Sequence, residues 1–200
     1  MLALSPTKPS SRRFSASLLS QAQSGSDAAI EALIARCEPR IFALARAILK
    51  EPALAEDVTQ ETLLRLIQQL PKLDTMADTF DTWLLCVARN LAIGLLRKRR
   101  VRGEMEFSED HELPDPSQLR DTEPPPLEMI AALEDAGRIS AALDQLPSIW
   151  REIVILRYYH DLEPAEIGTV IGDSAVNVRV RLFRAIRELR SLLQDKEDSR

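Results

Sequence analysis

The sequence predicts an all-α protein in which two small helical domains are joined by a flexible acidic linker. Aromatic residues make up only 4% of the 200 residues, and Ala, Leu, Arg and Glu dominate, a composition that favours helices. Apolar side chains recur at helical spacing on both sides of residues 103–126. That segment carries five prolines among its acids and cannot bury enough apolar surface to fold, so we expect a tether.

The domain boundaries follow from the same pattern. The first residues, MLALSPTKPSSRR, are rich in proline, serine and basic residues, which predicts a disordered start. We therefore expect a disordered tail (1–14), a first domain (15–102), the linker (103–126), a second domain (127–195) and a C-terminal tail (196–200).

The net charge of −5 is unevenly distributed along the chain. Residues 103–136 hold eleven acids and one base, a local charge of −10, so the remaining segments together carry +5. The acidity belongs mainly to the linker and does not count against nucleic-acid binding by the flanking domains.

Several classes of protein are disfavoured by what the sequence lacks. No apolar run approaches the ~18 residues of a membrane span, and the N-terminus lacks the apolar run of a signal peptide, so we expect a cytoplasmic protein without membrane insertion. Cys37 and Cys86 lie within apolar helical patterns and are expected to be buried, reduced thiols. With only two histidines and no Gly-rich phosphate loop, we expect no enzyme, no metal site and no cofactor.

The first domain begins with three helical patterns. The first starts near Ser15 and breaks at Gly25, and the second resumes with Asp27 as N-cap and is interrupted or kinked at Pro39. The third opens at Pro52 and ends before Pro71. Its predicted buried side comprises Val58, Leu63, Leu66, Ile67 and Leu70, and its outer side is led by Glu56, Asp57, Gln60 and Glu61. On its own, that acidic cluster favours solvated surface over a docking site.

A loop over residues 70–80 leads to the helix predicted at 81–102. This helix is apolar in its first half and ends in a basic cluster formed by Arg97, Lys98, Arg99, Arg100 and Arg102. The like charges in such a cluster repel one another unless an anion is near, and phosphates are the usual partner. The helix dipole also favours cations at this end, so ordinary capping can account for part of the cluster.

The second domain contains the pattern of a helix-turn-helix. Helices are predicted at 127–146 and from Pro147, followed by a short helix at 164–172, a turn at Gly172 and a final helix capped by Ser174. The final helix, 174–193, is amphipathic and arginine-rich. Its apolar stripe is Ala175, Val178, Leu182, Ile186, Leu189 and Leu193, and we expect Val176 and Val180 to lie outside it. An isolated helix of this kind suggests a solvated basic face, but the helix-turn-helix frame favours DNA.

Taken together, three segments in order resemble a bacterial RNA polymerase sigma factor of the sigma-70 family, extracytoplasmic-function group. They are AEDVTQETLLRL, then TFDTWLLCVARNLAIGLLRKRR and, after the linker, LDQLPSIWREIVILRYYHDLEPAEIGTVIGDSAVNVRVRLFRAIREL. The resemblance implies that the first domain grips the polymerase β′ coiled coil and recognises the melted minus-ten element. It implies that the second domain reads the duplex minus-thirty-five element, and it adds the β flap and an anti-sigma factor to the partners to be considered.

By position, the resemblance carries roles to individual residues of the first domain. Asp57 and Gln60, with Glu61 beside them, match the polymerase-contacting part of the AED-x-x-Q motif. Asn90 matches the residue that helps to hold a flipped non-template base, and the loop at 71–80 matches the pocket for that base. Arg97 and Arg100 are expected to contact DNA near the minus-ten element. Trp83 matches a helix-start aromatic, for which packing is favoured over base stacking.

In the second domain, the predicted contacts to the minus-thirty-five element are Ser174, Asn177, Arg179, Val180, Arg181 and Arg184. Several positions depart from the family pattern: Val176 and Asn177 replace Gly-Thr, Val180 replaces a serine, Ile186 an arginine, Gly94 an aspartate and Leu63 an aromatic residue. We expect Val176 and Val180 to face thymine methyl groups. The alternatives are a stand-alone dimeric helix-turn-helix repressor, which the acidic pattern at 56–61 disfavours, and an enzyme of nucleic-acid metabolism.

Overall fold

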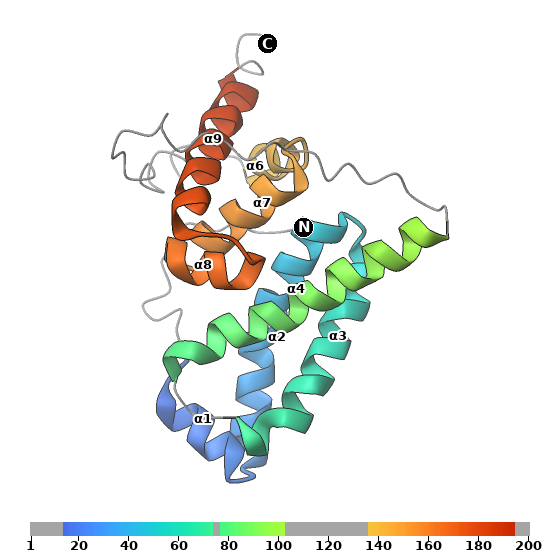
Figure 1. Cartoon of the computed structure of the whole chain (residues 1–200). Coiled ribbons are helices and arrows are strands. Elements are labelled where there is room, and N and C mark those ends of the chain that lie inside the picture. The colour runs from blue at the N-terminus through green and yellow to red at the C-terminus, as the bar shows by residue number, and fades with distance from the viewer. Residues whose placement is uncertain (1–13, 74–76, 103–135, 195–200) are drawn as a thin grey trace. The chain divides into compact units, whose positions relative to one another are not determined.

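The computed structural model describes residues 14–73, 77–102 and 136–194 (Figure 1). These described residues form helices and connecting turns, without a strand. Contacts between Cα atoms divide the chain into two compact units, whose described parts are residues 14–73 with 77–102, and residues 136–194. The tail at 1–13, the linker at 103–126 and residues 127–135 of the predicted helix lie outside the described residues.

The first unit contains α1 (Ala16–Gln23), α2 (Asp27–Leu49), α3 (Pro52–Gln69), a 3-10 turn η1 (Leu70–Lys72) and α4 (Ala77–Val101). Helix α2 packs against α1, α3 and α4, and α3 also packs against α4. The core is built from aliphatic side chains on these helices. Its largest fully buried members are Leu33, Ile41, Leu44, Leu49, Leu66, Leu84 and Leu85.

The start of this unit differs from the prediction at Phe14 and at the N-cap of α2, and it settles one of the two outcomes left open at Pro39. Phe14, assigned to the tail, is buried because its ring packs edge-on against Phe80 at 4.9 Å between centroids. The N-cap of α2 is Ser26 rather than Asp27, since the Ser26 hydroxyl accepts a hydrogen bond from the amide of Ala29. Helix α2 continues through Pro39, so Pro39 does not interrupt it.

Helix α3 begins and ends where its prolines predict, but its apolar side is narrower than expected. Val58 and Leu66 are buried, whereas Ile67 is exposed, as is the neighbouring Leu64. Hydroxyl groups complete the buried side: Thr59 donates to the carbonyl of Ala55 and Thr62 to that of Val58. The assignment of Ile67 to the core was therefore wrong.

Helix α4 corrects the expectation about membrane spans. The stretch Thr79–Val101 is long and apolar enough to cross a membrane by length and composition alone, because a mean hydropathy tolerates the charges that interrupt the apolar run. In the first unit, however, its apolar side chains Leu84, Leu85, Ala88, Ala92 and Leu96 are buried. Near its start, Asp81 forms a buried ion pair with Arg40 at 3.0 Å. One side of helix α4 is therefore packed into the core of the first unit.

The second unit contains α6 (Ala136–Leu143), α7 (Ser148–Val154), a π-helical turn η3 (Ile155–Tyr159), α8 (Pro164–Ile171) and α9 (Ala175–Gln194). Helix α9 packs against α6, α7 and α8. The buried Arg151 of α7 donates hydrogen bonds to the carbonyls of Leu143 and Leu146, both at 2.8 Å. This guanidinium therefore ties the end of α6 and the turn that follows it to α7.

Candidate nucleic-acid interface

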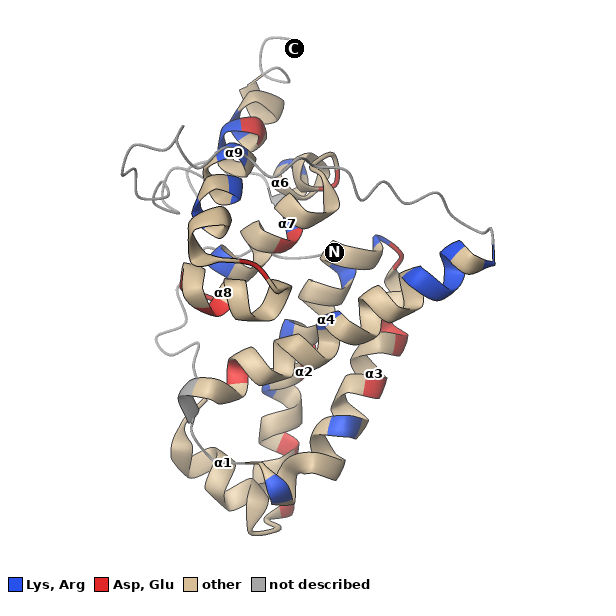
Figure 2. Ribbon diagram, viewed as in Figure 1, with Lys and Arg blue, Asp and Glu red and all other residues tan. Residues whose placement is uncertain are grey.

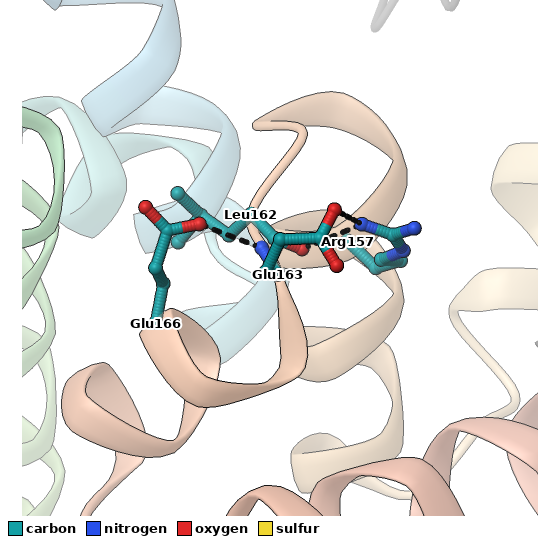
Figure 3. Close-up of polar contacts among 4 residues, drawn as sticks. All are labelled: Arg157, Leu162, Glu163 and Glu166. Carbon is teal, nitrogen blue, oxygen red and sulfur yellow. Dashed lines mark hydrogen bonds and ion pairs between the residues drawn. The ribbon is translucent and has the colours of Figure 1, made fainter. Parts of the chain in front are cut away.

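The helix-turn-helix is positioned by polar contacts at the start of α8 (Figure 3). Arg157 donates to the carbonyl of Leu162 at 3.0 Å and to Oε1 of Glu163 at 2.8 Å. The amide of Glu163 in turn donates to Oε2 of Glu166 at 2.8 Å, as in a capping box. These bonds hold the first turn of α8 against the preceding turn η3.

Two glycines shape the turn between α8 and α9. Gly172 ends α8 with a φ of 76°, a left-handed conformation that glycine adopts without steric cost. Gly168 is needed for a different reason, because a Cβ at this position would lie 2.5 Å from the carbonyl oxygen of Asp173. The turn therefore approaches α8 so closely that position 168 has no room for a side chain.

Helix α9 presents only some of its predicted DNA-binding residues to solvent. Arg179 is exposed and makes no hydrogen bond or ion pair within the described part of the chain. Arg184 is half-buried. Val176 is 49% exposed, which matches its placement outside the apolar stripe. Ser174 is exposed and caps the helix, since its hydroxyl accepts from the amide of Asn177 at 3.1 Å.

Val180 corrects the predicted interface. It is only 1% exposed and belongs to the core of the second unit, so it cannot touch a thymine methyl group. The reason is that α9 packs against three helices, which bury a wider arc of its surface than the single stripe used for the prediction. Val180 is therefore removed from the candidate DNA-binding residues.

Asn177 and Arg181 are both tied to Asp173. The amide nitrogen Nδ2 of Asn177 donates to Oδ1 of Asp173 at 2.7 Å, and Nε of Arg181 lies 3.2 Å from Oδ2. The Arg181 side chain is 12% exposed and that of Asp173 is 17% exposed. The guanidinium of Arg181 is thus folded back on the turn.

The second candidate surface is the basic end of α4 (Figure 2). Asn90, Arg97 and Arg100 are exposed and make no hydrogen bond or ion pair within the described residues. Asn90, Gly94 and Arg97 follow one another on one side of the helix, and a Cβ built at Gly94 would meet no atom within 4 Å apart from its chain neighbours and the backbone of its own helix. Arg99 differs, since it pairs with Glu51 at 2.6 Å. One member of the cluster is therefore engaged within the unit.

The base of the predicted pocket loop is held by α1. Gln23 donates through Nε2 to the carbonyls of Leu70 and Leu73, at 3.1 and 2.6 Å. These carbonyls flank the start of the segment at 71–80 that the resemblance assigns to the flipped base. Trp83 is half-buried and lies 6.1 Å from Phe80 between ring centroids, in keeping with the packing role.

The third candidate surface is the outer side of α3, where Figure 2 shows acidic residues. Asp57 and Gln60 are exposed and have no hydrogen bond or ion pair within residues 14–73, 77–102 and 136–194. Glu61 is also exposed but pairs with Arg65 at 2.8 Å, one helical turn away. The exposed Leu64 follows on the same side, one turn beyond Gln60 and Glu61.

Three residues of these surfaces were missed from the sequence. Asp173 could have been found, because Asp173, Asn177 and Arg181 are spaced at i, i+4 and i+8. Gly168 lies in the first helix of the helix-turn-helix, where a close approach is a standard reason for glycine. Gln23 gave no signal, since its partners lie 47 and 50 positions away.

Comparison with known proteins identifies the family. Residues 33–102 match the family described as Sigma-70 region 2, and residues 136–189 match Sigma-70, region 4. The chain is 36% identical over 145 residues to the ECF RNA polymerase sigma factor SigL of Mycobacterium tuberculosis. The aligned residues cover 72% of this chain and 77% of SigL. The chain belongs to the extracytoplasmic-function group of the sigma-70 family.

Two further comparisons each cover 90% of the chain. The probable RNA polymerase sigma factor RfaY of Xanthomonas campestris pv. campestris is 30% identical over 181 residues, covering 90% of this chain but only 44% of RfaY. A solved structure of CnrH in complex with the cytosolic domain of CnrY superposes with a TM-score of 0.59 at 25% identity, covering 90% and 97% of the two chains.

Membership of this family decides between the alternatives raised by the sequence. An RNA polymerase sigma factor accounts for both matched regions, whereas a stand-alone helix-turn-helix repressor accounts only for the second and is not supported. Sigma factors are in general non-catalytic transcription initiation factors. The basic and acidic surfaces described above therefore lie on regions 2 and 4 of a sigma factor.

Proposed function

We propose that this sigma factor directs promoter-specific initiation by binding core RNA polymerase and recognising two promoter elements. Region 2 takes the melted minus-ten element and region 4 takes the duplex minus-thirty-five element. The observation that carries the proposal is that each matched region holds exposed arginines with no hydrogen bond or ion pair among the described residues, Arg97 and Arg100 in one and Arg179 in the other. Arginine is suited both to phosphates and to guanine edges.

For region 2, we assign base capture to Asn90 and backbone contacts to Arg97 and Arg100. A flipped base needs hydrogen-bond partners that offset its lost stacking, and the exposed amide of Asn90 can donate and accept. The open space over Gly94 lets a strand approach the helix between Asn90 and Arg97.

For region 4, we assign duplex contacts to Arg179, with Ser174, Asn177 and Arg184 beside it. Arg179 lies in the second turn of α9, close to the end that enters the major groove in helix-turn-helix proteins. Arg181 is placed behind the interface, because its ion pair with Asp173 holds it against the turn.

For the polymerase, we assign docking to the outer side of α3. Asp57 and Gln60 supply polar groups that have no partner in the part of the chain that the structure describes, and Leu64 adds an exposed apolar contact on the same side. An exposed apolar side chain beside polar groups is typical of a protein interface. Region 4 is assigned to the β flap by family resemblance.

We further propose a regulatory protein partner and a place of action. CnrH, which resembles this chain along nine-tenths of its length, is bound in its solved structure to the cytosolic domain of CnrY. The sigma factor RpoE of Bartonella quintana is bound in its structure to the anti-sigma factor NepR, and by analogy we include an anti-sigma factor among the partners. The protein acts in the cytoplasm, where polymerase and promoters are found, and it has no catalytic role or cofactor of its own.

The docking assignment is tested by charge reversal on α3. Asp57→Arg is expected to weaken binding of the full chain to core polymerase at least tenfold, because a like charge at an interface costs more than ~1.4 kcal/mol. The matched control is Glu31→Arg, which reverses an exposed acid on α2. Binding is measured by fluorescence anisotropy, with circular dichroism to check helicity. Equal binding by both variants would remove the outer side of α3 from the interface.

Promoter specificity is tested by run-off transcription from a promoter library with core polymerase and the full chain. We expect transcripts from a subset of promoters that share two elements. Transcription that is independent of the added chain would contradict the proposed function.

A further inference from the structure

The carboxylate of Asp173, just before α9, makes two hydrogen bonds and one ion pair with Ser174 and with residues of the recognition helix. Oδ1 of Asp173 accepts hydrogen bonds from the amide of Ser174 and from Nδ2 of Asn177, each at 2.7 Å. Oδ2 forms the ion pair with Nε of Arg181 at 3.2 Å. Three of the residues predicted to meet DNA are thus attached to one side chain that was not among them.

This carboxylate is costly for a helix that binds a polyanion. A negative charge near phosphates is repelled, and the ion pair also cancels the charge of Arg181 at the end of α9 nearest the turn. Capping does not require it, because the hydroxyl of Ser174 already accepts from the amide of Asn177. What Asp173 adds is control over the side chains of Asn177 and Arg181.

The hydrogen bond between Asn177 and Asp173 decides which group Asn177 can present to a base. An asparagine amide can exchange its nitrogen and oxygen by rotation about its last bond, and so can present a donor or an acceptor. With Nδ2 bound to Asp173, that exchange would place two oxygens against each other. Oδ1 of Asn177 makes no hydrogen bond within the described part of the chain. The amide is therefore held with its acceptor available.

We propose that Asp173 is a positioning residue that sets the base preference of α9. It holds Asn177 as an acceptor for a base with a major-groove amino group, adenine N6 or cytosine N4, and it withdraws Arg181 from the duplex. Its carboxylate lowers the affinity for DNA of any sequence and raises the preference for one base pair. The inference rests on the proposed function of region 4 in duplex recognition.

The test uses holoenzyme formed from the full chain and core polymerase. Bound DNA is selected from a duplex library randomised over the upstream element, and binding to an unrelated duplex is measured at two salt concentrations. The variants are Asp173→Ala, which removes both the acceptor and the charge, Asp173→Asn, which keeps an acceptor without the charge, and Asn177→Ala. The matched control is Glu188→Gln, which removes an exposed acid further along α9.

The wild-type chain should select an adenine or cytosine at one position. Asp173→Ala and Asn177→Ala should relax that same position by about three- to tenfold, the value of one hydrogen bond. The double variant should relax it no further. Asp173→Asn should keep the preference and bind unrelated DNA about threefold more tightly at low salt, with the gain shrinking as salt screens the charge. Glu188→Gln should match the wild type.

The outcomes separate the inference from the function on which it rests. If Asp173→Ala kept the wild-type base preference, the proposed positioning of Asn177 by Asp173 would be wrong. It would also be wrong if Asp173→Ala and Asn177→Ala relaxed the base preference at different positions. If the role of Asp173 were purely structural, Asp173→Ala would lower thermal stability and leave the base preference in the selected DNA unchanged. That result would also overturn the inference. A wild-type chain that selects no upstream sequence would overturn the proposed duplex recognition itself.

Discussion

Cys37 is a residue whose surroundings decide its chemistry. It lies on α2 with no exposed surface, and burial raises the pKa of its thiol from 9.0 to about 12. The nearby Arg40 acts in the opposite direction but does not outweigh burial. The thiol is therefore protonated throughout the physiological range and is a poor nucleophile.

This pKa makes the stability of the first unit dependent on pH above 9. Between pH 9 and 12 the unfolded thiol has lost its proton and the folded one has kept it, so the free energy of unfolding falls as pH rises. The slope from this group approaches ~1.4 kcal/mol per pH unit. Urea unfolding at pH 8 and pH 10, followed through Trp83 in a Trp150→Phe background, measures the loss.

Cys37→Ala is the control for this prediction. It should lower stability at pH 8 by a small cavity cost and should show a shallower decline between pH 8 and pH 10. An identical decline in both proteins would mean that other groups, among them the half-buried Cys86, cause the pH dependence.

At the scale of elements, two helical glycines provide a matched pair. A methyl group at Gly168 would meet the backbone of Asp173 at 2.5 Å, whereas one at Gly94 would meet no atom within 4 Å apart from its chain neighbours and the backbone of its own helix. Gly168→Ala should therefore destabilise the second unit by about 1–3 kcal/mol, the usual cost of overpacking. Gly94→Ala should stabilise the first unit by roughly 0.5–1 kcal/mol, because alanine is the better helix former. Thermal unfolding of the two full-length variants measures both changes.

The same pair separates stability from function. If a strand approaches α4 over Gly94, Gly94→Ala should slow promoter melting although it stabilises the fold. A Gly94→Ala variant that is more stable and melts promoters at the wild-type rate would show that this side of α4 stays clear of DNA.

What could be predicted from the sequence was local. Proline and capping residues placed the ends of α3 and α8 correctly, because these signals act within one helical turn. The exposure of Ile67 and the burial of Val180 could not be predicted, since each depends on how many helices surround its own. The contact of Gln23 with the carbonyls of Leu70 and Leu73 depends on the packing of distant segments.

At the scale of the whole molecule, the two matched regions lie in separate compact units, which implies separable tasks. Residues of one unit should affect one step of initiation and not the other. Asn90 and Arg179 suit the test, because both are exposed and neither has a hydrogen bond or ion pair within the described residues. Their removal should leave each unit folded.

We expect Asn90→Ala to slow formation of the open complex by about three- to tenfold, the value of one hydrogen bond, without weakening duplex binding. Arg179→Ala should do the opposite, costing about 1–3 kcal/mol on the preferred duplex and relaxing one base pair. Duplex binding by the holoenzyme is measured in the cold, before melting, and strand opening by permanganate reactivity after warming. The double variant should show the sum of both losses to within about 0.5 kcal/mol, since distant sites add. Loss of both steps in either single variant would show that the tasks are not divided between the two units. If Arg179→Ala changed only the salt dependence of duplex binding, Arg179 would be a phosphate contact rather than a base contact.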